Sequence, residues 1–280
     1  MATQIPVGSG SFVLLKADAS QLEWMTKVFL AQDQVALREL WDLKDKPKEE
    51  DLHSQNKEAF KLPTRTIAKN FLYRMIFADA FGDRGFGGPA YAYANDPDFS
   101  HVSSSVKYWE KVVDRFFSKY TGIYQHGISS IRLASENGQI EGPSGRIWPF
   151  KPFERAGGWD WPRTNILNYP VQGTAADFMI LARRIAWRSI RSLDLSQDQI
   201  VLFISTVHDD IELDISNDIE LIRKVGVLLE QSFIKIPAEF EKQFGNHVNV
   251  PLSGEVKVGY CLFEDSMVGL QKYLDNPSII

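Results

Sequence analysis

Two apolar runs that flank an acidic turn constrain the fold of this chain more than any other feature of its sequence. Residues 200–205 and 211–215 are rich in aliphatic and β-branched side chains, which is typical of paired strands. Asp209 and Asp210 lie between them, so the sequence predicts a hairpin that carries two adjacent carboxylates at its turn. Divalent cations such as Mg²⁺ would account for these charges, with Asp18 as a distant third carboxylate. A solvated acidic turn is the simpler interpretation, because such turns are common.

Length and composition limit the class of protein. The chain has 280 residues, of which 44% are hydrophobic, enough for one large domain or two small ones with a substantial core. No apolar run approaches the ~18 residues of a membrane helix, and the amino terminus lacks the basic and apolar regions of a signal peptide. We therefore expect a soluble protein without a membrane span. Cys261 is the single cysteine, which excludes an internal disulfide and fits a reducing, cytoplasmic compartment.

The charge of the chain argues against one kind of DNA binding. A formal net charge of −5 does not suit a nonspecific coat for nucleic acid, which needs positive charge to release counterions from phosphates. Basic residues nevertheless recur at helical spacing in two segments, namely Lys107, Lys111, Arg115 and Lys119, and Arg183, Arg184, Arg188 and Arg191. Each series is either a solvated helix face or a series of phosphate contacts, and both interpretations stay open.

Periodicity and turn residues predict alternating helices and strands. Strands are expected at 12–17 and 252–258, and helices at 20–32, 63–80, 104–119, 171–193 and 218–233. The charged segment 40–58 is expected to be mobile or to lie on the surface, and the segment 82–100, rich in Gly and Pro, to form an irregular loop. The Asn137-Gly138 and Ser144-Gly145 dipeptides indicate a small hairpin system within 131–148.

The helix expected after Pro63 carries a second informative pattern. Its residues Arg65, Lys69, Tyr73 and Phe77 recur every four positions, so one helix face presents two cations and then two rings. That order suits a nucleoside triphosphate, because cations near the positive end of the helix would bind phosphates while the rings meet sugar and base. A surface helix with aromatic residues in the core is the alternative.

These patterns occur together and in order, and in that arrangement they resemble the family A DNA polymerases, the DNA polymerase I family, most closely the phage replicative branch. The resemblance covers about residues 4–265 and rests on four segments: Asp18 to Glu23 as motif A, Arg65 to Phe77 as motif B, Asn168 to Asp177, and Val207 to Asp210 as motif C. It implies an α+β fold, with a right-hand palm of antiparallel sheet and helices, mainly helical fingers, and no thumb or exonuclease. The implied domains are palm at 1–33 and 126–280 and fingers at 34–125.

The resemblance implies a site for two Mg²⁺ ions. Asp18 and Asp209 would hold the ions, with the backbone carbonyl of Ala19 as a further ligand. One ion would activate the primer 3′-hydroxyl, and the other would neutralise charge as pyrophosphate leaves. Asp210 is implied as a further catalytic carboxylate, although it stands where the family usually has glutamate and is one methylene shorter.

Further roles are implied for residues that contact the substrates. His53, Arg65 and Lys69 would contact the triphosphate, and Lys69 would also donate a proton to pyrophosphate. Tyr73 would pack on the sugar, and Glu23 would block a ribose 2′-hydroxyl. The remaining implied contacts are Gln21 to the dNTP, and Phe77, Asn168, Gln172 and His208 to the DNA near the new base pair.

The implied activity is template-directed DNA synthesis on primer-template DNA with dNTPs. Because Gln4 to Val7 resembles a segment that follows the thumb in longer relatives, we expect a second polypeptide that carries the thumb and a 3′–5′ exonuclease. The expected location is the cytoplasm of a bacterium or of a phage-infected host. Two alternatives are a noncatalytic descendant that binds primer-template or a partner, and an unrelated metal-dependent phosphohydrolase that uses the same carboxylates.

Overall fold

The computed structural model describes residues 12–47, 49–77, 88–155 and 157–280, which fold as two compact units. Unit 1 comprises the chain up to Leu22, Ala176–Val248 and Leu252–Ile280, and unit 2 comprises Glu23–Ala175 and Asn249–Pro251. Among the described residues, no helix has both the length and the apolar character that crossing a bilayer requires.

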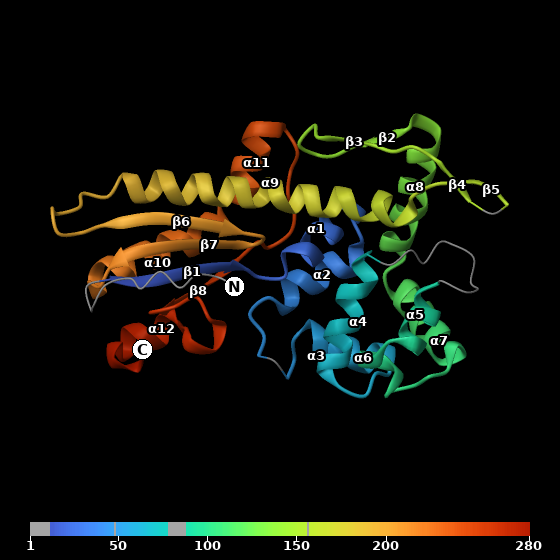
Figure 1. Cartoon of the computed structure of the whole chain (residues 1–280), viewed down its shortest axis with the longest axis horizontal. Coiled ribbons are helices and arrows are strands. Elements are labelled where there is room, and N and C mark those ends of the chain that lie inside the picture. The colour runs from blue at the N-terminus through green and yellow to red at the C-terminus, as the bar shows by residue number, and fades with distance from the viewer. Residues whose placement is uncertain (1–11, 48, 78–87, 156) are drawn as a thin grey trace. The chain divides into compact units, whose positions relative to one another are not determined.

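A five-stranded antiparallel sheet organises unit 1 (Figure 1). In spatial order its strands are β6 (Val201–Val207), β7 (Asp210–Ser216), β1 (Phe12–Ala19), β8 (Gly254–Gly259) and β9 (Val268–Gly269). The predicted hairpin is confirmed as β6 and β7, and the strands expected at 12–17 and 252–258 are confirmed as β1 and β8. The acidic turn is thus joined to a strand from the opposite end of the sequence.

The two faces of this sheet differ in chemistry because side chains alternate along each strand. One face is apolar and buried, with Val13, Leu15, Ala17, Ile211, Leu213, Ile215, Val256 and Val258. The opposite face, here called the charged sheet face, carries Lys16, Asp18, Asp210, Glu212, Asp214 and Lys257. A one-residue slip of β1 would move Lys16 and Asp18 to the apolar face, so burial of that face fixes the register that places Asp18.

Helix α10 (Ile219–Ile234) covers the apolar face of the sheet. Its N-cap Asp218 accepts hydrogen bonds from the N–H groups of Glu220 and Leu221, which satisfies two donors of the first turn. Phe233 lies so close to the β8 backbone that a Cβ at Gly254 would stand 2.4 Å from its ring. Glycine at that position is therefore required by packing, and the helix predicted at 218–233 is confirmed.

Three further helices belong wholly or partly to unit 1. They are α9 (Arg163–Arg191), which begins in unit 2, α11 (Ile236–Phe244) and α12 (Leu270–Asp275); short 3-10 turns lie at Glu264–Ser266 and Pro277–Ile279. Helix α9 begins eight residues before the predicted start at 171 and contains Pro170. Burial of Ile166, packed with Ala134 and Phe150, stabilises these added turns although proline removes one helical hydrogen bond.

Unit 2 is mainly helical. Its helices are α1 (Leu22–Ala31), α2 (Gln34–Leu43), α3 (Leu52–Phe60), α4 (Arg65–Phe77), α5 (Pro89–Asn95), α6 (Pro97–Ser100), α7 (Val106–Lys119) and α8 (Thr121–Asn137). Two small hairpins follow, β2 (Gln139–Glu141) with β3 (Ile147–Pro149) and β4 (Phe153–Arg155) with β5 (Gly158–Asp160). The helices predicted at 20–32, 63–80 and 104–119 correspond to α1, α4 and α7, and residues 78–80 of the second prediction lie outside the described residues.

The structure corrects three local predictions in unit 2, two of them only in part. The segment 40–58 lies largely on the surface, as expected, but it also contains the end of α2 and most of α3, which Asp51 caps by accepting a 2.9 Å hydrogen bond from the Ser54 N–H. The described part of 82–100 forms α5 and α6, each with proline in its first turn, where the missing N–H costs little. The hairpin predicted at Ser144-Gly145 is confirmed as the turn between β2 and β3, whereas Gly138 caps the end of α8 with φ 68° rather than turning a hairpin.

An aromatic core holds the helices of unit 2 together. Phe60, Phe71, Trp109, Phe116 and Tyr120 are fully buried, and their rings contact one another at centroid distances of 5.2–6.4 Å. Lys119 completes this core, since its Nζ lies 2.7 Å from both Glu39 Oε1 and Asn56 Oδ1. Arg115 donates a 2.9 Å hydrogen bond to the Phe60 carbonyl. Two of the four cations considered as phosphate contacts on α7 therefore bind protein groups.

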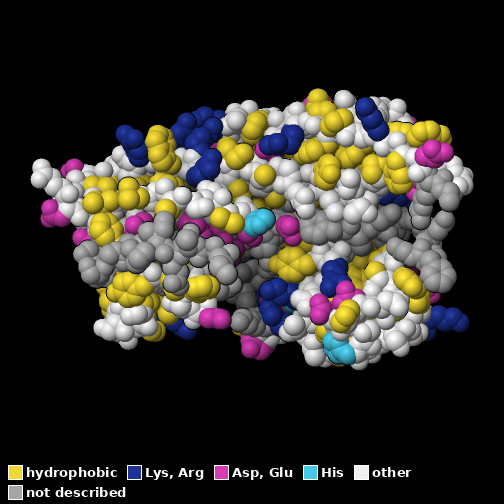
Figure 2. Space-filling model, in the orientation of Figure 1, with side chains coloured by type: hydrophobic (Ala, Val, Ile, Leu, Met, Phe, Trp, Pro, Cys, Tyr) yellow, Lys and Arg dark blue, Asp and Glu magenta, His cyan; other side chains and the backbone are white. Residues whose placement is uncertain are grey.

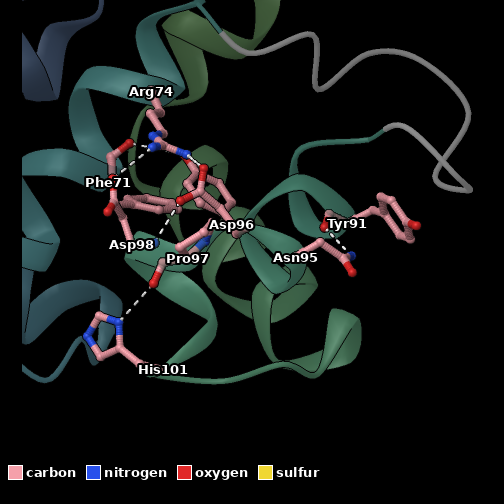
Figure 3. Close-up of polar contacts among 9 residues, drawn as sticks. Phe71, Arg74, Tyr91, Asn95, Asp96, Pro97, Asp98 and His101 are labelled. Carbon is pink, nitrogen blue, oxygen red and sulfur yellow. Dashed lines mark hydrogen bonds and ion pairs between the residues drawn. The ribbon is translucent and has the colours of Figure 1, made fainter.

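Arg74 anchors the last turn of α4. Its guanidinium pairs with Asp96 and lies 3.3 Å from Asp98, both at the junction of α5 and α6 (Figure 3). The same group lies 4.7 Å from the centre of the Phe99 ring, a cation–π contact. These contacts fix the helix that carries Arg65, Lys69 and Tyr73.

Candidate active site

Three carboxylates converge on the charged sheet face of unit 1. One ligand oxygen from each of Asp18, Asp209 and Asp210 lies within 4.8 Å of the others. Asp18 is directly across from Asp210 in the β1–β7 register, and Asp209 occupies the turn before β7. The antiparallel sheet therefore brings together groups that are 191 residues apart in the sequence. Acidic side chains gather along the β6–β7 hairpin on the face shown in Figure 2.

The hairpin turn is bound directly to the end of β1. The Ala19 N–H donates a 3.0 Å hydrogen bond to the carbonyl of Asp209, and the Ser20 N–H donates one of 2.9 Å to the carbonyl of Ser253. His208 has φ 52°, in the left-handed region, which turns the chain before Asp209. The backbone thus fixes Asp209 relative to Asp18 independently of any bound ion.

Burial and the neighbouring carboxylates both raise the pKa of Asp18. Burial, together with the negative charges of Asp209 and Asp210, raises its pKa to about 6, while Lys16 and Lys257 oppose this change. A cation bound nearby would lower the pKa of Asp18, because a positive charge favours the ionised form of a carboxyl group.

The donor set fits hard divalent cations. All three side chains offer carboxylate oxygens, the ligand type that Mg²⁺ prefers, and no sulfur or imidazole ligand is part of this described cluster. Asp18 and Asp209 are the two positions that the motifs assign as ligands. Asp210 is buried and paired with Lys16, whose Nζ lies 2.7 Å from its Oδ2.

In unit 2, α4 carries the second group of predicted residues at a spacing of four, namely Arg65, Lys69, Tyr73 and Phe77, here called the α4 cation–aromatic face. Thr64 caps the helix, because its hydroxyl accepts a 3.2 Å hydrogen bond from the Ile67 N–H. Arg65 lies in the first turn, where the helix dipole favours anions. Lys69 is exposed, and its Nζ lies 5.9 Å from the centre of the Tyr73 ring.

Arg65 is held by a carboxylate that the motifs did not indicate. Its Nε lies 3.2 and 3.1 Å from the two carboxylate oxygens of Asp51, and its Nη2 also pairs with Asp51. Burial would raise the pKa of Asp51, but the hydrogen bonds from Arg65 and the Ser54 N–H hold it below its usual value. A triphosphate that binds Arg65 would therefore compete with Asp51.

His53 lies beside this face in its neutral form. It is 4% exposed, and burial lowers its pKa to about 4, which outweighs the opposing effect of Asp51. Its ring centre lies 6.1 Å from that of Tyr73, and its buried Nδ1 has no hydrogen-bond partner among the described residues. A neutral imidazole contributes a hydrogen bond rather than a positive charge to any phosphate bound here.

The remaining predicted residues lie in several elements. Ala19 ends β1, Gln21 lies between β1 and α1 with φ 50°, and Glu23 is in the first turn of α1. Asn168 and Gln172 lie in α9, and His208 is exposed at the hairpin turn. Phe77 ends α4, but its side chain lies outside the described residues. Contacts of these residues with substrates stay predictions.

Sequence reasoning missed two charged partners at the site. Lys16 could have been found from strand alternation, because it stands two residues before Asp18 and so shares its face. Asp51 gave no such signal, since its pairing with Arg65 depends on how α3 packs against α4. Both missed residues pair with residues that the motifs had singled out.

Comparisons with known proteins identify the family. The sequence model of DNA polymerase family A matches residues 4–263, and the chain therefore belongs to this family. Its fold is similar to that of the POL domain of Pol1 from M. smegmatis, solved as a complex with DNA primer-template and dNTP, with a TM-score of 0.64 and 22% sequence identity. That match covers 90% of this chain and 40% of the mycobacterial chain. No curated protein matches the sequence.

Proposed function

We propose that the chain catalyses template-directed DNA synthesis by adding dNTPs to a primer 3′-hydroxyl through two-metal nucleotidyl transfer. Membership of family A supports the class of reaction. The observation that carries the proposal is the convergence of Asp18 and Asp209 within 4.8 Å on adjacent structural elements, fixed by the hydrogen bond between Ala19 and the Asp209 carbonyl. In this proposal residues 1–33 and 126–280 form the palm, and residues 34–125 form the fingers.

Asp18 and Asp209 would hold two Mg²⁺ ions, with the Ala19 carbonyl as a further ligand. When bound, such ions activate the attacking hydroxyl and stabilise charge on the leaving pyrophosphate. The sheet register and the turn hydrogen bond fix the backbone at Asp18 and Asp209, and this positions the two carboxylates. Because Asp18 is partly buried, its carboxylate would attract a bound cation more strongly than an exposed carboxylate would.

The α4 cation–aromatic face would bind the incoming nucleotide. Arg65 exchanges Asp51 for the triphosphate, Lys69 binds phosphate and donates a proton to pyrophosphate, and Tyr73 packs on the sugar. His53 adds a hydrogen bond to the triphosphate. Gln21 and Glu23 would also contact the dNTP, with Glu23 excluding a 2′-hydroxyl, and Phe77, Asn168, Gln172 and His208 would contact the DNA near the new base pair.

We further propose that a second polypeptide, carrying a thumb and a 3′–5′ exonuclease, helps to hold the DNA. The net charge of −5 supports this, because duplex binding draws much of its affinity from cations on phosphates. Because the motifs resemble those of the phage replicative branch, we also predict that the chain belongs to that branch.

Primer extension with one labelled dNTP tests the proposed function. The purified chain with Mg²⁺ is expected to add only the nucleotide complementary to the template, weakly and distributively alone and more strongly with its partner. Binding of primer-template without extension would favour the noncatalytic descendant. Hydrolysis of dNTPs without any template dependence would favour a phosphohydrolase. Processive extension by this chain alone would contradict the need for a second polypeptide.

A further inference from the structure

Lys16 forms a largely buried ion pair with Asp210, one of the three residues of the carboxylate cluster. Lys16 Nζ lies 2.7 Å from Asp210 Oδ2, and the two side chains are only 18% and 12% exposed. Lys16 precedes Asp18 by two residues on β1, while Asp210 is directly across from Asp18 on β7. The pair therefore lies on the charged sheet face and involves the carboxylate that differs from the family's usual glutamate.

The sheet register explains why this lysine reaches Asp210. The residue directly across from Lys16 is Glu212, and Asp210 is the diagonal neighbour toward the turn. Diagonal neighbours in antiparallel strands are roughly 7–8 Å apart at their Cα atoms, a span that a lysine side chain bridges. Lys16 thus reaches diagonally across the sheet and binds Asp210, a member of the carboxylate cluster.

An ion pair at this place has two physical consequences. Lys16 offsets one of three negative charges whose ligand oxygens lie within 4.8 Å of one another. It also fixes one oxygen of Asp210, so this carboxylate cannot turn freely toward an ion bound by Asp18 and Asp209. Because both partners are largely buried, solvent screens the pair less than it screens a surface ion pair.

We propose that Lys16 is a positioning residue that holds Asp210 by one oxygen and thereby limits the number of carboxylates available to divalent ions. Asp18 and Asp209 are then the metal ligands, and Asp210 is an oriented, charge-balanced neighbour. This inference rests on the proposed function for its consequences in catalysis, but the metal-binding prediction stands apart from activity.

Binding of Mn²⁺ to the free protein, measured from the EPR signal of unbound ion, tests the proposal without DNA or dNTP. Lys16→Met is expected to raise Mn²⁺ affinity about fivefold, because Asp210 becomes available as a third ligand. Lys16→Arg retains the ion pair and is expected to stay within about twofold of the wild type. Thermal unfolding by circular dichroism identifies any variant that fails to fold.

A double-mutant cycle separates positioning from simple charge. In an Asp210→Asn background, Lys16→Met is expected to change Mn²⁺ affinity by less than about twofold, since no carboxylate remains to be released. Lys257→Met removes one positive charge from the neighbouring strand of the same face and measures the effect of charge alone. An unchanged affinity in Lys16→Met, or an equal gain with Asp210→Asn, would overturn the proposal.

Primer extension then distinguishes this inference from the proposed function. If the wild type extends a primer, Lys16→Met is expected to lower kcat about tenfold with little change in the KM for dNTP, and Lys16→Arg to restore it. If the Mn²⁺ results are as expected but the wild type extends no primer in the presence of its partner, the positioning role stands and the proposed function fails. Extension by the wild type together with additive effects in the Mn²⁺ cycle would support the proposed function and overturn the positioning role.

Discussion

The charged sheet face of unit 1 and the α4 cation–aromatic face of unit 2 contain the two main groups of proposed site residues, and they are built in opposite ways. The first joins Asp18 to Asp209 through strand pairing across 191 residues. The second lies along one helix at a spacing of four. The first depends on the sheet as a whole, and the second on local helix geometry with a long-range partner, Asp51. We therefore expect substitutions on the charged sheet face to lower activity more than substitutions on the α4 cation–aromatic face.

The largest effect is expected at the carboxylate that the backbone fixes most directly. Asp209→Asn keeps the shape and the carbonyl that accepts from the Ala19 N–H, but removes the charge. Primer extension is expected to fall on the order of 10³-fold, because the site loses a ligand for its ions. Extension rates measured at saturating dNTP check this, and unchanged activity would exclude Asp209 as a metal ligand.

A smaller loss is expected on the helix. Lys69→Met should lower kcat/KM for dNTP about a hundredfold, because the triphosphate loses a charge-assisted contact and pyrophosphate its proton donor. Lys107→Met on α7 is the matched control, since it also removes one exposed lysine. If Lys107→Met is equally damaging, the basic series on α7 contacts phosphates and the assignment to α4 is too narrow.

One lysine in each unit has a different environment, and the lysine of unit 2 predicts that the free energy of unfolding depends on pH. Lys16 is paired with Asp210, whereas Lys27 of unit 2 is 3% exposed and burial lowers its pKa to about 8. Between pH 8 and 10.5 the folded chain has lost this proton and the unfolded chain retains it, so the free energy of unfolding should rise with pH. Lys27→Met should abolish that rise and add about 3 kcal/mol at pH 7.

Urea denaturation at about pH 7 and about pH 9.5 checks the buried lysine. The wild type is expected to be more stable at the higher pH, and Lys27→Met to show the same stability at both. A Lys27→Met protein that is less stable than the wild type at neutral pH would mean that the lysine charge is compensated in the fold.

The smallest effect is expected at the partner of Arg65. Asp51→Asn retains an oxygen that can cap α3 but removes the charge that holds Arg65. The KM for dNTP is expected to fall about threefold with kcat unchanged, because the triphosphate no longer displaces a carboxylate. Steady-state extension measures both constants, and a raised KM would show that Asp51 orients Arg65 for binding instead of competing for it.

Local sequence patterns predicted most of the helices and strands, but they did not predict which charged side chains from different elements pair. The hairpin at Asp209 and the helix that presents Arg65 and Lys69 follow from periodicity and turn residues. Asp51 and Pro89 were interpreted as parts of irregular segments although each lies at a helix start, because the residues that cap helices are also those that favour loops. Strand alternation places Lys16 on the face of Asp18, but its pairing with Asp210 depends on the register between β1 and β7.

The central claim is that Asp18 and Asp209 on the charged sheet face hold the divalent ions for nucleotidyl transfer. The most direct test is a crystal structure with primer-template, a nonhydrolysable dNTP and Mn²⁺, with the ions located by anomalous scattering. The account predicts that Mn²⁺ binds Asp18 and Asp209. Mn²⁺ bound elsewhere would contradict it.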